Sequence, residues 1–358
     1  MRILDRNIII LGICTIALVV LSIVILQPAV AGDGVSYVLA IDFLVGKDVA
    51  FTAVAHRIIT TFGGLWVVIG LSKIFGSVLG VWFAMNTVLY TTVIFVFYKL
   101  LTLLFEDKRS ALIGTLFLAT NYAVLRFGLN FLMDMGGWAF YLFSIYFLLR
   151  YSKFGQRKDI LLASALVGLG GLFKEYAFLP TIPIAIFLIY ESRWSLIKII
   201  KNSWLPSLLA IVPTLLVYSF VYFKFGYSYL DWLQTNEQTY VYQSRIVEYI
   251  KSFGSVINLL GILFVAGLVA VYKEWGNLEK RTKLYIVSIG ASFLPIFIWP
   301  AITQRILFIT VPFVTMVATF AFRRYPKYAP VFILALVLYI LASFTMDSFL
   351  LNFINLPL

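Results

Sequence analysis

The stretch IITTFGGLWVVIGLSKIF, residues 58–75, is apolar enough to count as a membrane span, and whether it crosses decides the topology of the whole chain. Of the chain's 358 residues, 62% are hydrophobic, 17% are aromatic and only 12% are charged. A water-soluble domain normally carries about 25% charged residues. The composition therefore predicts an all-α polytopic membrane protein.

Eleven other runs are expected to cross roughly 30 Å of hydrocarbon, which takes about 20 helical residues each, although 110–125 and 160–173 are short. The single cysteine, Cys14, lies in the first run, which excludes intramolecular disulfides and cysteine-based metal sites. The runs lie near residues 7–26, 78–104, 110–125, 129–149, 160–173, 176–190, 204–222, 254–272, 284–299, 306–322 and 329–346.

Basic residues indicate the side that each loop faces, because Lys and Arg concentrate in cytoplasmic loops. If residues 58–75 crossed, five later basic clusters would face the opposite side from Arg2 and Arg6. If residues 58–75 instead form a re-entrant or interfacial helix on the outer surface, the cytoplasmic side holds 19 Lys and Arg against 7 acids, and the outer side holds 9 of each. The clusters are Lys108/Arg109, Arg150/Lys153/Arg157/Lys158, Arg193/Lys198/Lys201, Lys273/Lys280/Arg281/Lys283 and Arg323/Arg324/Lys327.

This count predicts eleven spans, a cytoplasmic N-terminus and an external C-terminus, and it assigns the whole net charge of +12 to topology. None of the basic clusters is long enough to form a nucleic-acid-binding face. Residues 27–77 and 223–253 become the long outer loops of a single module, residues 1–358. No internal repeat or flexible linker divides it, and residues 347–358 are too few for a soluble C-terminal domain.

Ionisable side chains near the apolar phase are costly and are functional candidates by default. Asp33 follows the first span, and apolar residues from Tyr37 then recur at helical spacing up to Gly46. Asp33 is either the N-cap of an interfacial helix or a general base that deprotonates a hydroxyl attacking a membrane-bound donor. The two roles are compatible.

Four further outer side chains each leave two interpretations open. Arg57, at the start of the apolar segment, is a snorkelling cation or a clamp on a lipid phosphate. His56 is expected to be an interfacial residue rather than a catalyst. Arg126 and Asp134 lie eight residues apart across a turn between two spans and either pair with each other or leave Asp134 facing a cavity near the substrate.

Two more cations lie in outer turns. Lys174 and Glu175 form a snorkelling pair, or Lys174 points at a phosphate, since a phosphate leaving group needs fixed positive charge. Arg305 lies at a helix start, where a positive charge opposes the helix dipole and a purely stabilising role is less natural. The loop between residues 224 and 251 is rich in aromatics, which form an interfacial belt or stack on a sugar or acceptor. These are Tyr227, Tyr229, Trp232, Tyr240, Tyr242 and Tyr249.

Taken in order, these features resemble the integral-membrane glycosyltransferases of the GT-C fold, in particular the protein O-mannosyltransferase and aminoarabinose-transferase group. The resemblance covers the whole chain, although this chain has Asp33-Gly34 where protein O-mannosyltransferases have Asp-Glu, which leaves the acceptor type open. The matching positions are Gly32-Asp33 with Tyr37, Arg57 before the interfacial segment, Asp134 after Arg126, the Lys174-Glu175 pair, and Arg305 with Pro312 downstream.

The resemblance implies inverting transfer of a hexosyl or pentosyl group from a polyprenyl- or dolichyl-phosphate donor to a lipid, glycan or protein acceptor on the outer face. We expect the membrane to be a prokaryotic plasma membrane. Asp33 would be the general base, and no metal or other cofactor would be required, although a divalent site at Asp33 and Asp134 stays open. Arg57, Lys174 and Arg305 would neutralise the departing phosphate, and the substrate would contact Tyr37, His56, Arg126, Asp134 and Glu175.

Two other classes of function stay open. A transporter or lipid-linked-sugar flippase would place its ionisable residues near mid-membrane and would often show inverted repeats. A non-catalytic scaffold would not need an aspartate in the first loop. The position of the candidates at outer helix ends favours the enzyme.

Overall fold

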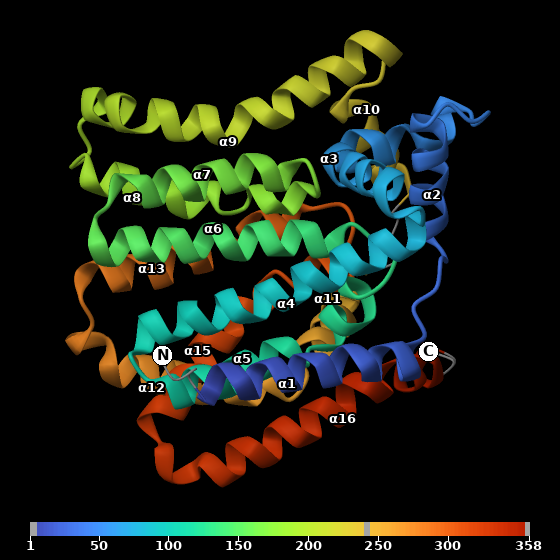
Figure 1. Ribbon diagram of the computed structural model, residues 1–358. Helices are drawn as coiled ribbons and strands as arrows, with labels where there is room; N and C mark the ends of the chain where they lie inside the picture. Colours follow the sequence, from blue (N-terminus) through green and yellow to red (C-terminus); the bar gives the residue numbers. More distant parts are fainter. Residues whose placement is uncertain (1–5, 240–243, 355–358) are drawn as a thin grey trace.

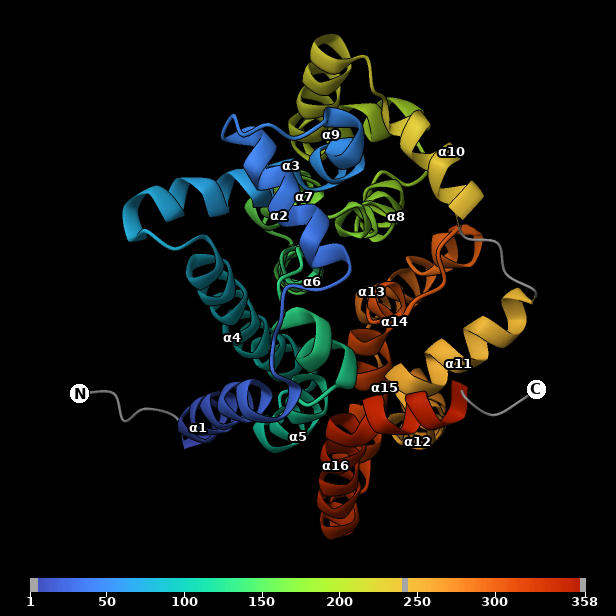
Figure 2. The same ribbon diagram turned by 90° about the vertical axis from the view of Figure 1, so that its right-hand side faces the viewer.

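The computed structural model describes residues 6–239 and 244–354, and all regular secondary structure in these residues is helical. Long helices run side by side in a bundle in Figure 1, and Figure 2 looks along the same bundle from its end. The helices of the bundle are α1 (Arg6–Leu21), α4 (Val78–Phe105), α5 (Lys108–Ala119), α6 (Asp134–Phe154), α7 (Arg157–Gly171), α8 (Thr181–Glu191), α9 (Leu196–Phe225), α12 (Leu260–Glu274), α13 (Lys280–Ala291), α15 (Thr310–Arg324) and α16 (Ala329–Ile354).

Further elements connect the bundle helices. Four of them, α2, α3, α10 and α11, gather at the right-hand end of the bundle in Figure 1, which we call the loop end. Their bounds are α2 Asp33–Leu44, α3 Phe51–Phe75, α10 Tyr229–Thr239 and α11 Arg245–Ile257. The remaining pieces are α14 (Gln304–Leu307), π-helical turns at Ser22–Leu26 and Val124–Gly128, and 3-10 turns at Glu175–Phe178, Trp275–Asn277, Leu294–Ile298 and Pro326–Tyr328.

Each of the eleven predicted runs falls mainly on one helix of the bundle. The predicted run 254–272 begins before its helix does, because α11 ends at Ile257 and α12 starts only at Leu260, after a bend of 84°. Among the described residues, six helical stretches are long and apolar enough to cross a membrane, or seven if the bent α11–α12 pair is one span. The others are too short or too polar to be counted by themselves, so the number of eleven spans stays a prediction.

Residues 58–75 form most of α3, which passes the same test of length and hydropathy. Helix α3 is seen nearly end-on in Figure 1 and lies across the view in Figure 2. It therefore runs in a different direction from the helices of the bundle. This direction is the one predicted for an interfacial helix. The helix begins at Phe51 rather than after Arg57, since Val54 and Ala55 already bury an apolar face, and its backbone is non-helical at Thr61.

The five loops that carry the basic clusters lie together at the left-hand end of the bundle in Figure 1, with the start of α1. We call this the basic end. These loops join α4 to α5, α6 to α7, α8 to α9, α12 to α13 and α15 to α16. The far end of α16 lies at the loop end, so the two ends of the described chain lie at opposite ends of the bundle.

Small residues let neighbouring helices of the bundle approach closely. A Cβ atom on Gly168 of α7 would lie 2.2 Å from the backbone oxygen of Leu209 in α9. α9 thereby packs on α7 although it contains Pro206 and Pro213. The contact fixes α7, and with it the turn that follows α7 at the loop end.

The direction of α3 predicts that both of its flanks are accessible from the same side of the membrane. In a Cys14→Ser background, Lys47→Cys before α3 and Lys73→Cys in its last turn should react with a membrane-impermeant maleimide added to one side. Lys201→Cys at the basic end should react only from the other side. Labelling of Lys47→Cys and Lys73→Cys from opposite sides would show that α3 crosses.

Candidate active site

Seven Asp, Glu, His, Lys and Arg side chains from distant parts of the sequence line one cavity of about 330 Å³ at the loop end. Asp33 is the first residue of α2 and Asp134 the first residue of α6. Arg57 lies in α3, Lys174 precedes the 3-10 turn after α7, and Arg305 lies in α14. Trp232 of α10 also lines the cavity, which therefore joins residues 27–77 and 223–253 to the ends of the bundle helices.

Both oxygens of the Asp33 carboxylate are paired with guanidinium groups. Arg57 donates from Nη2 to Oδ1, and Arg305 donates from Nη1 to Oδ2 at 2.7 Å. The N-cap of α2 is Gly32, and no side chain caps this helix end. The N-cap interpretation of Asp33 is wrong, because the carboxylate turns toward the two cations instead of the backbone N–H groups of its own helix.

The charges around Asp33 lower its pKa. Partial burial alone would raise the pKa, but the guanidinium groups of Arg57 and Arg305 outweigh burial and lower it to about 2. The same cluster raises the pKa of Arg305 despite burial, chiefly through Asp134. Asp33 is therefore a carboxylate and Arg305 a cation at every physiological pH.

Arg57 and Lys174 point into the protein rather than toward the membrane surface. The side chain of Arg57 is only 12% exposed, and its guanidinium lies 4.7 Å from the centre of the Tyr37 ring. Its Nε also donates to Ser36 Oγ at 3.2 Å. Lys174 Nζ donates to the Tyr37 hydroxyl at 3.3 Å and lies 3.8 Å from Glu175 Oε2, with both side chains nearly buried. The snorkelling interpretations of Arg57 and of the Lys174-Glu175 pair are wrong.

Asp134 is completely buried, and its partners differ from the predicted one. The Tyr176 hydroxyl donates to Asp134 Oδ1 at 2.8 Å, and Arg305 Nε lies 3.7 Å from the same oxygen. Oδ2 has no hydrogen-bond partner among the described residues. The predicted pair of Arg126 with Asp134 is wrong, because the π-helical turn at Val124–Gly128 aims Arg126 at the carbonyl of Leu26, 3.2 Å away.

Arg126 lines a second cavity, of about 280 Å³, which shares Asp33 and Arg305 with the first. The Asp33–Arg305 ion pair therefore separates two cavities. His56 lines only the first of them. Burial and the adjacent Arg57 lower the pKa of His56 to about 4, so the imidazole is neutral at physiological pH and adds no positive charge.

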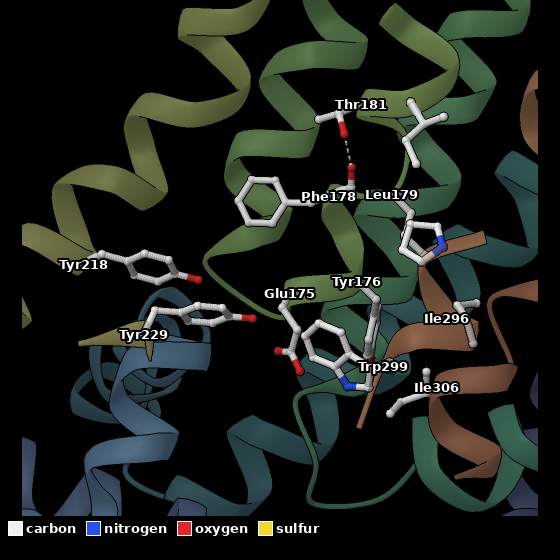
Figure 3. A pocket seen from close by; sticks show the side chains of 12 residues that line it. Glu175, Tyr176, Phe178, Leu179, Thr181, Tyr218, Tyr229, Ile296, Trp299 and Ile306 are labelled. Carbon is white, nitrogen blue, oxygen red and sulfur yellow. Dashed lines mark hydrogen bonds between the residues drawn. The ribbon is translucent and has the colours of Figure 1, made fainter. Parts of the chain in front are cut away.

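A third cavity, of about 360 Å³, is almost entirely apolar and adjoins the polar one. Glu175, Tyr176, Trp299 and Ile306 line both. Figure 3 shows the Glu175 carboxylate turned toward the hydroxyl groups of Tyr218 and Tyr229, while Phe178, Leu179 and Thr181 form the part farther from Trp299. The polar cavity thus continues into an apolar one at Glu175.

Aromatic rings from α9, from α10 and from the segment before α14 line these two cavities. The rings of Trp232 and Trp299 lie 5.7 Å apart, and Tyr229 packs on Trp232 at 4.9 Å and on Tyr218 at 5.1 Å. The positions of Tyr229 and Trp232 fit a contact with substrate better than a lipid-facing belt. Tyr240 and Tyr242 lie outside the described residues. Sequence reasoning missed Tyr218 and Trp299, which carry no signal beyond being aromatic near an outer helix end.

No group of three His, Cys, Asp or Glu side chains that could hold a metal ion is found within residues 6–239 and 244–354. Asp33 and Asp134, the pair considered for a divalent cation, both contact Arg305, which supplies positive charge between them. Independence from metal stays a prediction.

A family comparison bears on this arrangement. Residues 60–222 match the family model of dolichyl-phosphate-mannose-protein mannosyltransferase. The match supports a GT-C-like glycosyltransferase. It spans just under half of the chain and includes Asp134, Lys174 and Glu175, whereas Asp33, Arg57 and Arg305 lie outside it. No curated protein matches the chain. A GT-C-like assignment agrees with the all-helical fold and its apolar helices.

The environment of His56 predicts an acid-shifted titration that can be measured directly, since His56 is the chain's only histidine. A sample labelled at histidine should give one imidazole NMR signal with a midpoint near pH 4. Because the neutral form is favoured in the folded state, protonation stabilises the unfolded chain, and thermal stability should fall as pH drops from about 6.5 toward 4. His56→Gln should reduce this fall. A midpoint at or above 6.5 would contradict the burial of His56 beside Arg57.

Proposed function

We propose that the protein transfers a sugar, with inversion, from a polyprenyl- or dolichyl-phosphate donor to an acceptor hydroxyl on the outer face of the membrane. One observation carries the proposal. A carboxylate paired with two partly buried guanidinium groups, and close to a buried lysine, lies in a polar cavity that continues into an apolar one. A ligand with a charged phosphate and a long hydrocarbon tail has this distribution of polarity.

Arg57, Lys174 and Arg305 are suited to bind the donor phosphate. Hydrogen bonds between fixed cations and phosphate oxygens are short and strong. Negative charge grows on the phosphate as its bond to the sugar breaks, and preorganised cations in a partly dry cavity stabilise that charge without having to reorganise. Because these three cations are already present, we propose that the reaction does not require a metal.

In the proposed sugar transfer, Asp33 is the base that accepts the proton of the acceptor hydroxyl. The acceptor oxygen forms a bond to the anomeric carbon on the face opposite to the phosphate, which inverts that carbon. The bond between the anomeric carbon and the phosphate oxygen breaks, and its electron pair leaves with the phosphate. The hydroxyl proton passes to the Asp33 carboxylate, which strengthens the attacking oxygen as it reacts.

The ion pairs of Asp33 connect donor binding to the strength of the base. A carboxylate with a pKa of about 2 accepts a proton poorly. A phosphate that shares Arg57 and Arg305 weakens their effect on Asp33, so the pKa of Asp33 rises when the donor is bound. We propose that the base is therefore weak in the empty site and becomes stronger once the donor occupies it.

The remaining side chains are suited to position the sugar, the acceptor and the tail. Glu175 Oε2 has no hydrogen-bond partner among the described residues and lies where the two cavities meet, so it can accept a hydrogen bond from a sugar hydroxyl. Asp134 and Tyr37 border the same cations, and His56 lines the polar cavity as a neutral imidazole. Arg126 lines the cavity on the other side of the Asp33–Arg305 pair, where we place the acceptor.

The orientation in the membrane follows from the basic clusters. We propose that the basic end faces the cytoplasm, because Lys and Arg are retained there. The loop end, the cavities and the C-terminus then face the outside, and a prokaryotic plasma membrane fits a donor on a polyprenyl phosphate.

Replacing the proposed base tests this function. With purified protein and radiolabelled polyprenyl-phosphate hexoses, Asp33→Asn should lower the transfer rate by a factor of about 10² to 10⁴, the usual contribution of general base catalysis. Asp42→Asn is the matched control, because Asp42 lies on the same helix and pairs with the exposed Lys47 outside the cavity. Asp42→Asn should keep the wild-type rate.

The thermal stability of both variants separates chemistry from folding. A folded Asp33→Asn protein with unchanged turnover would remove Asp33 from the mechanism. Absence of transfer by the wild type with every polyprenyl-phosphate hexose would contradict the proposed donor class.

A further inference from the structure

A cleft of about 430 Å³ at the basic end lies at the opposite end of the bundle from the candidate active site and has no part in the proposed reaction. It is formed by the last turns of α4 and α6 and the start of α5. The side chains that line it are Tyr98, Lys99, Thr102, Leu103, Glu106, Lys108, Tyr146, Arg150 and Phe154.

The charge of the cleft is positive. Three of its lining residues, Lys99, Lys108 and Arg150, are cations. Arg150 pairs with the buried Asp159 at 3.3 Å, and the one acid of the lining, Glu106, pairs with Lys153 at 3.2 Å. Lys99 is exposed and makes no ion pair within the described part of the chain. Lys99 thus offers its positive charge to a ligand from outside.

The polar groups inside the cleft are also suited to an anionic ligand. The hydroxyl oxygen of Thr102 is buried and has no hydrogen-bond partner among the described residues. A threonine hydroxyl in a helix usually donates to the carbonyl four residues earlier, as Thr91 does to Thr87 at 2.8 Å. The hydroxyls of Tyr98 and Tyr146 are further polar groups of the lining, and Asn7 donates to Tyr98 at 3.3 Å.

The apolar side chains beside Lys99 indicate that the ligand enters from the membrane. Lys99 lies more than one helical turn before the end of α4 at Phe105. Leu103 lines the cleft beside it, and Phe154 lines the rim with 56% of its surface exposed. A group that reaches both Lys99 and Lys108 must therefore extend along an apolar surface at the end of two bundle helices.

We propose that this cleft binds an anionic phospholipid. Its headgroup phosphate contacts Lys99, Lys108 and the Thr102 hydroxyl, and its acyl chains lie along the apolar surface beside Leu103 and Phe154. Basic pockets between membrane helices bind anionic headgroups in this way. The site stands independently of the proposed transfer reaction, because it shares no residue with the cavities at the loop end.

Native mass spectrometry of the delipidated full-length protein tests the site. Phosphatidylglycerol should be retained in preference to phosphatidylcholine with the same acyl chains. Lys99→Gln should weaken retention of phosphatidylglycerol about five-fold, the effect of one basic residue near an anionic headgroup. Lys201→Gln is the matched control, because Lys201 is an exposed lysine at the basic end that lies outside the cleft. It should leave retention unchanged.

The outcomes that overturn the proposal are distinct. Equal retention of the two lipids, no effect of Lys99→Gln, or equal losses in Lys99→Gln and Lys201→Gln would each exclude a specific site. Displacement of the lipid by inorganic phosphate at equal concentration would assign the cleft to a free phosphate instead. Thr102→Val, which removes only the hydroxyl, should also weaken retention and keeps every charge in place.

Discussion

The two ion pairs of Asp33 are the interaction on which the site depends. Arg57 and Arg305 bind the two oxygens of one carboxylate, and Arg305 lies 272 residues further along the chain. The pairs join α2 and α3, which lie across the loop end, to the short helix α14 that precedes α15. Removal of one partner would leave the other charges partly buried and uncompensated, which costs more than the intact pairs contribute.

The cluster around these pairs is electrically balanced. Arg57, Lys174 and Arg305 face Asp33, Asp134 and Glu175, so three cations and three carboxylates share one cavity and its border with the apolar one. An anion can bind only by sharing cations that the carboxylates already hold. In the proposed reaction, this constraint links phosphate binding to the release of Asp33. The position of these charges at one end of the bundle also differs from a transport pathway, in which ionisable residues lie near the middle of the membrane.

Much of the fold was predictable because it follows from composition and from the distribution of charge. The basic clusters predicted that residues 58–75 form a re-entrant or interfacial helix although they are apolar enough to span, and the apolar spacing after Asp33 predicted α2. The helix ends were less accurate, since hydropathy does not register the bend after Ile257 or the π-helical turn at Arg126.

The pairing of the site residues could not be read from the sequence in the same way. Spacing does not distinguish an N-cap aspartate from one in the first turn, and it favours nearby partners, which led to the wrong pair of Arg126 with Asp134. The actual partners of Asp134, Tyr176 and Arg305, are 42 and 171 residues away. The sequence did indicate which ionisable residues belong to the loop end, because each lies near the end of an apolar run.

A cryo-EM structure of the full-length protein in lipid nanodiscs with a bound polyprenyl phosphate tests the central claim most directly. The account predicts the phosphate in contact with Arg57, Lys174 and Arg305, the tail in the apolar cavity between Phe178 and Tyr218, and Asp33 no longer paired with both guanidinium groups. A phosphate bound elsewhere, with Asp33 still held by both, would contradict it.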